Sequence, residues 1–307
     1  MTDKILIHEV GMRDGLQMEE RVVPMEQKLG WIQRLSDSGL DIIQAGSFVH
    51  PERVPQMADT DRMFAALASQ STGTRKTVYS GLVLNEKGLE RGLKCGVGMF
   101  CMGVSASETH SRKNSGMGTS EATDRIIAMA KQAEAAGKRV QVSVQSAFGC
   151  GYEGPVSHER VLGIAGRYLD AGLKRISLAD TAGHATPDQV EQLYGAIFKL
   201  DSTVECACHF HNTYGLALAN CYAAMNAGVR NFESSVAGLG GCPFTKIAGG
   251  NACTEDLVHM LHRMKMRNDI HLEKLIEVAR EIASFFKRDM DGVVYKTGPI
   301  TAGQPAQ

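Results

Sequence analysis

The feature that most constrains the fold of this chain is a regular alternation of short apolar runs and longer amphipathic segments along its whole length. The apolar runs are rich in Val, Ile, Phe and small residues, and most are bounded by Gly, Asn or Asp, as buried strands are. The eight strand candidates are Lys4–Val10, Asp41–Ser47, Thr77–Leu84, Val97–Ser105, Arg139–Phe148, Arg175–Asp180, Thr203–Asn212 and Asn231–Gly238. Eight strand–helix units in series predict a parallel sheet closed into a (β/α)8 TIM barrel, with a doubly wound open sheet as the alternative.

The segments between the strands have the apolar spacing of helices. The clearest examples are Pro24–Gly39, Thr119–Gly137, Ser157–Gly172 and Pro187–Leu200. The recurring endings Ser38-Gly39, Ala136-Gly137, Ala171-Gly172 and Ala227-Gly228 predict glycine C-caps that pass the chain to the next strand. Beyond the eighth strand, Thr254–Met264 and Leu272–Arg288 are predicted helices. No linker divides the chain, so we expect one α/β domain over residues 1–307 with a C-terminal helical extension over about 265–307.

Composition excludes several classes of protein. Hydrophobic residues make up 43% of the chain and charged residues 22%, the profile of a soluble globular protein with a large core. The formal net charge of −1 favours neither nucleic acid nor an anionic membrane surface as a partner. No apolar run approaches the roughly 20 residues that span a bilayer, and the N-terminus lacks a signal-peptide pattern. We therefore expect a cytoplasmic protein whose eight scattered cysteines are thiols.

Polar residues where a barrel strand ends are the first candidates for chemistry, because barrel enzymes carry their sites at the C-terminal ends of the strands. The first strand runs into EVGMRDGLQ, in which Arg13 and Asp14 lie between two glycines. Glycine allows the backbone to approach a ligand closely. Taken alone, however, an Arg-Asp pair in a turn is more often a solvated ion pair.

A second cluster, ECACHFHN, lies at the end of the seventh strand. Side chains alternate along a strand, so His209 and His211 share one face. Two such imidazoles at a barrel mouth predict a site for a divalent metal, especially with a carboxylate opposite. Cys206 and Cys208 fall on the other face, toward the surrounding helices, where free cysteine is a small buried hydrophobe. This alternation argues against reading the segment as a zinc cage.

A third cluster follows the last strand and contains five glycines between residues 238 and 250. A loop of this length in a compact domain is typical of a lid or a binding loop. Cys242, near its middle, is either an exposed thiol that exchanges a proton or an unremarkable loop residue. Asn251 precedes a predicted N-cap and acidic first turn at Thr254, so its amide is either a ligand or part of a turn.

Longer segments of the chain resemble the 3-hydroxy-3-methylglutaryl-CoA lyases. These belong to a wider group of barrel metallolyases that includes isopropylmalate and homocitrate synthases. The resemblance extends from about residue 5 to about residue 262. It rests on EVGMRDGLQ, SFVHPERVPQMAD, SASETHSRKN, SAFGCGYEG, ISLADTAGHATP, HFHNTYGLALAN, SSVAGLGGCPF and GGNACTEDLVHML. The GLGGCP loop is specific to the lyase branch, whereas the Arg-Asp turn and the H-x-H pair are shared more broadly.

The resemblance implies a role for individual residues of this chain. It implies that Mg²⁺ or Mn²⁺ is bound by Asp14, His209, His211 and Asn251, a mixed ligand set that suits such a cation. Arg13 matches the arginine that stabilises the enolate-side oxygen. Cys242 matches the cysteine that protonates the departing enolate, and Asp180 matches a second carboxylate that is a candidate for proton transfer.

The residues expected to bind substrate are Gln17 and Ser107, which lie in the matching segments, and Gln44 of the second strand. Arg112 and Lys113 fall in a predicted loop, where they either meet the phosphates of CoA or form a solvated pair of charges. The substrate implied is an acyl-CoA thioester. The expected assembly is a homodimer or a larger homo-oligomer.

The chain departs from the family pattern close to the expected cation. Gln44 stands where family lyases carry a glutamate at the end of strand two, and Ala45-Gly46 replace two small polar residues, which predicts open space there. Asn212 replaces an aspartate after the H-x-H pair, and Met12 replaces a proline. Two carboxylates fewer make the site less negative, which predicts an altered substrate preference.

These residues favour a metal-dependent carbon–carbon lyase that splits a 3-hydroxy-3-substituted acyl-CoA into acetyl-CoA, or a shorter acyl-CoA, and a keto acid. The default substrate implied by the resemblance is 3-hydroxy-3-methylglutaryl-CoA. The alternatives are a lyase for another thioester, such as a citramalyl-CoA, a Claisen-type synthase that joins an acyl-CoA to a 2-keto acid, and an inactive barrel that binds metal or acyl-CoA.

Overall fold

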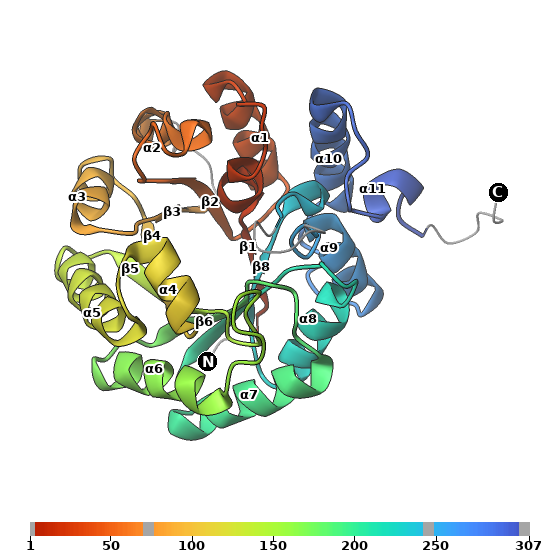
Figure 1. The fold of residues 1–307 in the computed structure, drawn as a ribbon. Helices are drawn as coiled ribbons and strands as arrows, with labels where there is room; N and C mark the ends of the chain where they lie inside the picture. Colours follow the sequence, from red (N-terminus) through yellow and green to blue (C-terminus); the bar gives the residue numbers. More distant parts are fainter. Residues whose placement is uncertain (1–3, 70–76, 242–248, 301–307) are drawn as a thin grey trace.

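The computed structural model describes residues 4–69, 77–241 and 249–300 of the 307 residues. Its strands form a closed barrel in which each strand pairs with its neighbours in the sequence and β8 pairs with β1, always in parallel (Figure 1). The strands are β1 (Leu6–Glu9), β2 (Ile42–Ser47), β3 (Val78–Leu82), β4 (Met99–Ser105), β5 (Arg139–Gln145), β6 (Arg175–Asp180), β7 (Glu205–Phe210) and β8 (Asn231–Ser234). The eight predicted strands are therefore confirmed, and the open sheet is excluded.

Helices surround the barrel and cover its outer face (Figure 1). They are α1 (Met25–Asp37), α2 (Thr60–Ser69), α3 (Glu86–Lys94), α4 (Glu108–Ser115), α5 (Thr119–Ala135), α6 (His158–Asp170), α7 (Pro187–Leu200), α8 (Ala217–Asn226), α9 (Thr254–Arg263), α10 (Leu272–Phe286) and α11 (Val294–Thr297). The two helices predicted after the eighth strand are α9 and α10, and α11 lies within the predicted C-terminal extension. An ion pair between Arg34 and Glu281 joins α10 to α1. Among the described residues, no helix is long and apolar enough to cross a membrane.

Local sequence explains where the helices begin and end. At the start of α7, Thr186 and Gln189 form a capping box and Pro187 occupies the first helical turn, so helix formation begins at the predicted residue. At the other end of such helices, Gly39, Gly137 and Gly172 have positive φ angles of 100°, 73° and 79°. Glycine adopts this backbone conformation without strain, so the predicted glycine C-caps are confirmed.

Two strands, β5 and β8, end three or more residues earlier than the apolar runs predict. β5 ends at Gln145 rather than Phe148, because Ser146 has a positive φ of 54° and turns the chain out of the sheet. β8 ends at Ser234 rather than Gly238 and is followed by a short 3-10 turn, Val236–Gly238. In both places buried apolar residues continue past the hydrogen-bonded ladder, so hydrophobicity alone overestimates the strand length.

The hydrophobic core lies between the barrel and its helices, and the barrel interior is different in character. Trp31 of α1 and Tyr194 of α7 are fully buried in the outer core. Inside the barrel, a small apolar group of Ile42, Met99 and Cys101 lies apart from that core. The interior also holds buried polar side chains, which belong to the site described next.

Candidate metal centre and active site

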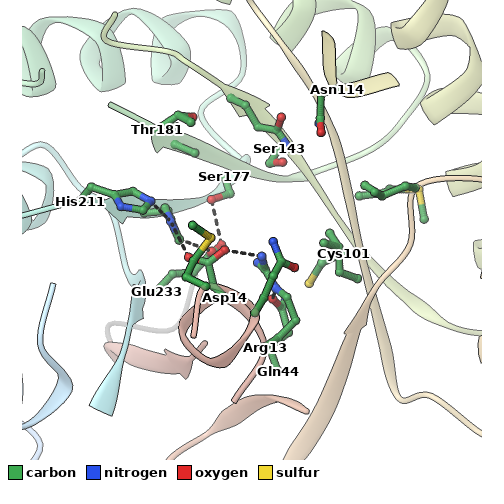
Figure 2. A pocket seen from close by; sticks show the side chains of 18 of the residues that line it. Arg13, Asp14, Gln44, Cys101, Asn114, Ser143, Ser177, Thr181, His211 and Glu233 are labelled. Carbon is green, nitrogen blue, oxygen red and sulfur yellow. Dashed lines mark hydrogen bonds and ion pairs between the residues drawn. The ribbon is translucent and has the colours of Figure 1, made fainter. Parts of the chain in front are cut away.

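A cavity of about 320 Å³ opens at the C-terminal ends of the strands. Its lining comes from the ends of most of the strands and from α4, and Figure 2 shows the polar side chains that face it. Sequence-predicted residues among its lining are Arg13, Asp14, Gln17, Gln44, His209 and His211. The topology therefore brings together residues that lie up to two hundred positions apart in the chain.

Asp14 is held by a five-residue π-helical turn, Gly11–Gly15, directly after β1. The turn is supported from below by Glu9, whose carboxylate accepts hydrogen bonds from the backbone of Gly11 at 2.7 Å and from Thr254 of α9 at 2.6 Å. Burial raises the pKa of Glu9 to about 7, although these hydrogen bonds oppose the effect. Residues of β1 and α9 thus fix the turn that carries Asp14.

Three electron-pair donors converge at this end of the barrel. The Nε2 atoms of His209 and His211 lie 3.2 Å apart, and the Nε2 atom of His209 lies 3.8 Å from Oδ2 of Asp14. Ligand atoms of the three residues all fall within 4.8 Å of one another, and Figure 2 shows His211 pointing toward Asp14. This confirms the predicted common face of the two histidines.

Asn251 completes the group through backbone pairing. An antiparallel bridge joins it to His211, and the backbone of Gly250 accepts a 2.7 Å hydrogen bond from Asn212. The amide nitrogen of Asn251 donates to Oδ2 of Asp14 at 2.9 Å. Its Oδ1 is buried and has no hydrogen-bond partner in the described part of the chain, which is costly unless a ligand occupies the position. Carboxylate, imidazole and amide donors with an orphaned oxygen fit a divalent cation.

The electrostatics of the cluster favour the deprotonated, ligating forms of two of these groups. Burial alone would raise the pKa of Asp14, but the charge of Arg13 and the neighbouring histidines hold it well below its ordinary range. Burial, reinforced by the proximity of His209, lowers the pKa of His211 to about 4. At neutral pH, Asp14 is therefore ionised and the His211 imidazole is neutral.

Arg13 lies against the cluster and is not a solvated residue. Its side chain is 11% exposed, and its guanidinium forms an ion pair with Asp14 and donates to Oε1 of Gln44 in β2. The structure thus removes the alternative that the Arg-Asp pair is a simple surface ion pair. It also shows that Gln44, whose side chain is buried, is the neighbour that orients the arginine.

The neighbouring cysteines of β7 point away from the cavity. Cys206 and Cys208 are buried among the hydrophobic residues between the barrel and its helices. Burial raises the pKa of the Cys206 thiol to about 12, so it stays protonated. Strand alternation therefore separated cavity-lining residues from core residues correctly in this segment.

The side chains of Asp180 and Ser107 lie near the mouth of the cavity, but they accept hydrogen bonds from backbone N–H groups. The carboxylate of Asp180 accepts hydrogen bonds from the backbone of His184 at 2.8 Å and of Ala185 at 3.0 Å. The hydroxyl of Ser107 accepts from the backbone of His110 at 3.1 Å and caps α4. Neither side chain is part of the cavity lining. Burial raises the pKa of the Asp180 carboxyl to about 6, and the charge of His209 nevertheless acts on this group and opposes the effect of burial.

The predicted loop at Arg112 and Lys113 is wrong, because both residues lie in α4. Arg112 forms an exposed ion pair with Glu108 one helical turn earlier, and the ammonium of Lys113 lies 4.5 Å from the ring centroid of Tyr152. The sequence SETHSRKN begins with a serine cap, a signal for a helix that its high polarity hides. The members of this helix that line the cavity are His110 and Asn114.

Three departures from the family pattern, Ala45-Gly46, Asn212 and Met12, do not line the cavity. The open space expected at Ala45-Gly46 is filled, because Ala45 is buried in the outer core and a Cβ on Gly46 would lie 2.6 Å from the hydroxyl of Thr60. The side chain of Asn212 accepts a hydrogen bond from the backbone of Ala217 at the start of α8 and does not line the cavity. Met12 is buried in the core. Gln44 is the departure that reaches the cavity.

Cys242 lies outside the described residues. The preceding residue, Gly241, lines the cavity.

Sequence reasoning missed the polar floor of the cavity. Glu233 of β8, Gln141 of β5 and Ser177 of β6 all line it, and Figure 2 shows Ser177 and Glu233 joined below His211. Hydrogen bonding from His209 lowers the pKa of Glu233 to about 2, even though its burial alone would raise it. A charged residue in the middle of a buried strand, NFESS, was the available signal.

Gly250 sets the position of Asn251, and its replacement by alanine tests this. A Cβ at Gly250 would lie 1.8 Å from the backbone oxygen of Gly238, so the segment has to move. We expect Gly250→Ala to lower the free energy of unfolding by about 1–3 kcal/mol and to weaken Mn²⁺ binding about tenfold or more. Chemical denaturation and Mn²⁺ titration measure the two effects.

The matched control is Gly163→Ala in α6, where nothing lies within 4 Å of the added Cβ. This change is expected to raise the free energy of unfolding by about 0.5–1 kcal/mol and to leave Mn²⁺ binding unchanged. Equal Mn²⁺ affinity in both variants would contradict the role of Gly250.

Comparisons with known proteins agree with the geometry. Residues 4–282 match the profile of the protein family described as HMGL-like. Hydroxymethylglutaryl-CoA lyase YngG of Bacillus subtilis is 39% identical over 91% of this chain and 92% of its own length. The 3-hydroxy-3-isohexenylglutaryl-CoA/hydroxymethylglutaryl-CoA lyase of Pseudomonas aeruginosa is 35% identical over 92% of each chain. An HMG-CoA lyase from Acinetobacter baumannii, solved with coenzyme A and 3-methylmalate, superposes with a TM-score of 0.91 at 35% identity over the whole of both chains.

Proposed function

The chain belongs to the HMGL-like family and is a carbon–carbon lyase, and from this premise we propose that it cleaves 3-hydroxy-3-methylglutaryl-CoA into acetyl-CoA and a keto acid. The observation that carries the proposal is the convergence of Asp14, His209, His211 and Asn251 beside Arg13 in one cavity. The inactive barrel and the Claisen-type synthase lose support, because curated relatives that match over nine-tenths of the chain are lyases.

The family is divalent-metal dependent, and we propose Mg²⁺ or Mn²⁺ as the cation of this chain. Asp14, His209, His211 and the orphaned Oδ1 of Asn251 would hold it. A divalent cation bound there supplies a Lewis acid that polarises substrate oxygen atoms.

The reaction requires a proton to leave the C3 hydroxyl and another to arrive at C2. As the C3 oxygen becomes a ketone, the C2–C3 bond breaks and its electron pair passes to the thioester, which becomes an enolate. The guanidinium of Arg13, held by Asp14 and Gln44, is proposed to stabilise the enolate oxygen as its charge develops. Protonation of the enolate at C2 completes acetyl-CoA. Cys242 stays the proposed donor of this proton, and Asp180 stays a proton-transfer candidate only by its match to the family.

A larger substituent at C3 is the second candidate for the substrate. Five apolar side chains line one side of the cavity: Val49, Val54, Leu82, Leu84 and Met102. A neighbouring cavity of about 350 Å³ shares Val49, Val54 and Leu84, so apolar surface continues beyond the first cavity. Such a wall fits an alkyl chain better than it fits a charged group. The Pseudomonas aeruginosa relative, whose name includes an isohexenyl substrate, is consistent with this candidate.

A panel of thioesters tests the proposal. Purified protein is freed of metal with a chelator, resupplied with Mg²⁺ or Mn²⁺, and incubated with 3-hydroxy-3-methylglutaryl-CoA, its 3-isohexenyl analogue or citramalyl-CoA. We expect acetyl-CoA from the first thioester with either metal and no product in the metal-free sample, as measured by mass spectrometry. Cleavage of an analogue alone would replace the substrate and keep the reaction, whereas cleavage of none of the three would contradict the proposed function.

Other sequence-based expectations stay predictions. They are substrate contacts by Gln17, Gln44 and Ser107, contacts of Arg112 and Lys113 with CoA phosphates, a cytoplasmic location and a homodimer or larger homo-oligomer. Light scattering after size-exclusion chromatography measures the assembly. The dependence of KM on substitutions at Arg112 and Lys113 measures their contribution to CoA binding.

A further inference from the structure

Glu233 lies beneath the candidate metal ligands and has no role in the function proposed above. We propose that Glu233 is a positioning residue that fixes the ring orientation and tautomer of His209, so that Nε2 faces the cation. This inference rests on the proposed metal site. It concerns how the site is built rather than which substrate enters it.

The contact between the two side chains sets the tautomer. Nδ1 of His209 lies 2.9 Å from Oε2 of Glu233, while Nε2 of the same ring faces His211 and Asp14. An ionised carboxylate can only accept a hydrogen bond, so Nδ1 carries a proton, and the neutral ring then presents its lone pair at Nε2. A hydrogen bond of this kind, from a ligating histidine to a carboxylate, orients the ring and makes the ligand more basic.

Strand register explains why Glu233 reaches His209. The two residues are register partners in the pairing of β7 with β8, so their side chains are neighbours on the inner face of the barrel. The carboxylate is itself anchored on its other oxygen. Oε1 accepts hydrogen bonds from Nε2 of Gln141 in β5 at 2.6 Å and from the hydroxyl of Ser177 in β6 at 2.9 Å. Hydrogen bonds between side chains of four consecutive strands, β5 to β8, therefore anchor His209.

The negative charge of Glu233 is a second reason why it would affect cation binding. Among the described residues that line the cavity, Asp14 and Glu233 are the two carboxylates, and Gln44 contributes no charge. Glu233 is only 7% exposed, so its negative charge is poorly screened by water. It supplies the second negative charge near a divalent cation from beneath the ligands.

The test compares Mn²⁺ affinity, measured from the free-ion signal in electron paramagnetic resonance, in the full-length protein and two variants. Glu233→Gln keeps the shape of the side chain and removes its charge, and it is expected to weaken Mn²⁺ binding about 10–100-fold. The control is Asp41→Asn, at the opposite end of the barrel, where the carboxylate accepts from Arg267 and from the backbone of Ile7. Asp41→Asn is expected to lower stability and to leave Mn²⁺ affinity unchanged.

Each result decides between the inference and its alternatives. Equal Mn²⁺ affinity of the wild type and Glu233→Gln would overturn the inference and leave the metal site standing. Failure of the wild type itself to bind Mn²⁺ would overturn the metal site and the inference with it. A comparable loss of affinity in Asp41→Asn would overturn the inference, because general destabilisation would then explain the result. If Glu233→Gln does not fold, Gln141→Ala replaces it, and unchanged Mn²⁺ affinity in that variant overturns the inference.

Discussion

Replacement of His211 by alanine is expected to weaken divalent-cation binding more than about 100-fold, because changes to groups that only support a ligand already cost about 10–100-fold. The reason lies in the geometry of the cluster. His211 is 7% exposed, its Nε2 lies 3.2 Å from that of His209, and its low pKa of about 4 keeps the ring neutral at pH 7. Loss of the cation removes a Lewis acid that supplies several kcal/mol, so kcat/KM for the cleaved thioester is expected to fall by about 10³-fold or more.

Mn²⁺ titration and steady-state kinetics measure these two effects of His211→Ala. His271→Ala is the control, because His271 is exposed at the start of α10. It is expected to match the wild type in both measurements. A His211→Ala enzyme that binds Mn²⁺ with wild-type affinity would contradict the assignment of this residue as a ligand.

The second large effect is expected at Arg13, where Arg13→Met should lower kcat by about 10²–10³-fold while Mn²⁺ stays bound. The guanidinium contacts Asp14 through one nitrogen and Gln44 through another, so the side chain is fixed before substrate arrives. A group fixed in this way stabilises developing negative charge without reorganising during the reaction. Arg13→Lys keeps the charge but cannot make both contacts in the same geometry, so an intermediate kcat is expected.

Measurement of kcat and Mn²⁺ affinity in the same preparations separates charge stabilisation from metal loss. Arg175→Met is the control, because Arg175 is partly exposed at the start of β6 and pairs with Glu205 at the opposite end of the barrel. Wild-type kcat in Arg13→Met would show that this arginine does not act on the reacting atoms. A parallel fall in Mn²⁺ affinity would show that it acts by holding Asp14.

Gln44 distinguishes this cavity from the family pattern, and the structure shows that its contact is with Arg13. Gln44 carries no charge, and its Oε1 accepts a hydrogen bond from Arg13. Of the two side chains that contact the guanidinium, only Asp14 therefore offsets its positive charge. An arginine with one fewer carboxylate partner is better able to bind an anionic group of the substrate. The substrate panel therefore includes citramalyl-CoA as well as the isohexenyl analogue.

Local pattern was sufficient to determine the fold class from the sequence. The strand–helix units carry their own signals, such as the capping box at Thr186 and the glycines that end α1, α5 and α6, and such signals need no knowledge of distant residues. Strand alternation also assigned His209 and His211 to the cavity and Cys206 and Cys208 to the core, because a period of two is a local property of the backbone.

The tertiary structure decided which of the named residues work together. Asp14 and Asn251 are 237 positions apart, and the chemistry of each alone is equally that of a turn residue. Only the closure of the barrel places β1 beside β8 and brings the Asn251 segment against the end of β7. Asp180 and Asn212 also lie where a strand ends, as candidate ligands do. In the folded chain, however, their side chains accept hydrogen bonds from backbone N–H groups.

By itself, then, the sequence determined the barrel, the common face of His209 and His211 and the family resemblance, because these follow from short-range periodicity and contiguous motifs. The sequence did not single out Glu233, whose importance depends on three partners in β5, β6 and β7. The role of a buried charge can be inferred only when the groups that compensate it are known. Here these groups belong to separate strands, and only the closed barrel places their side chains in contact.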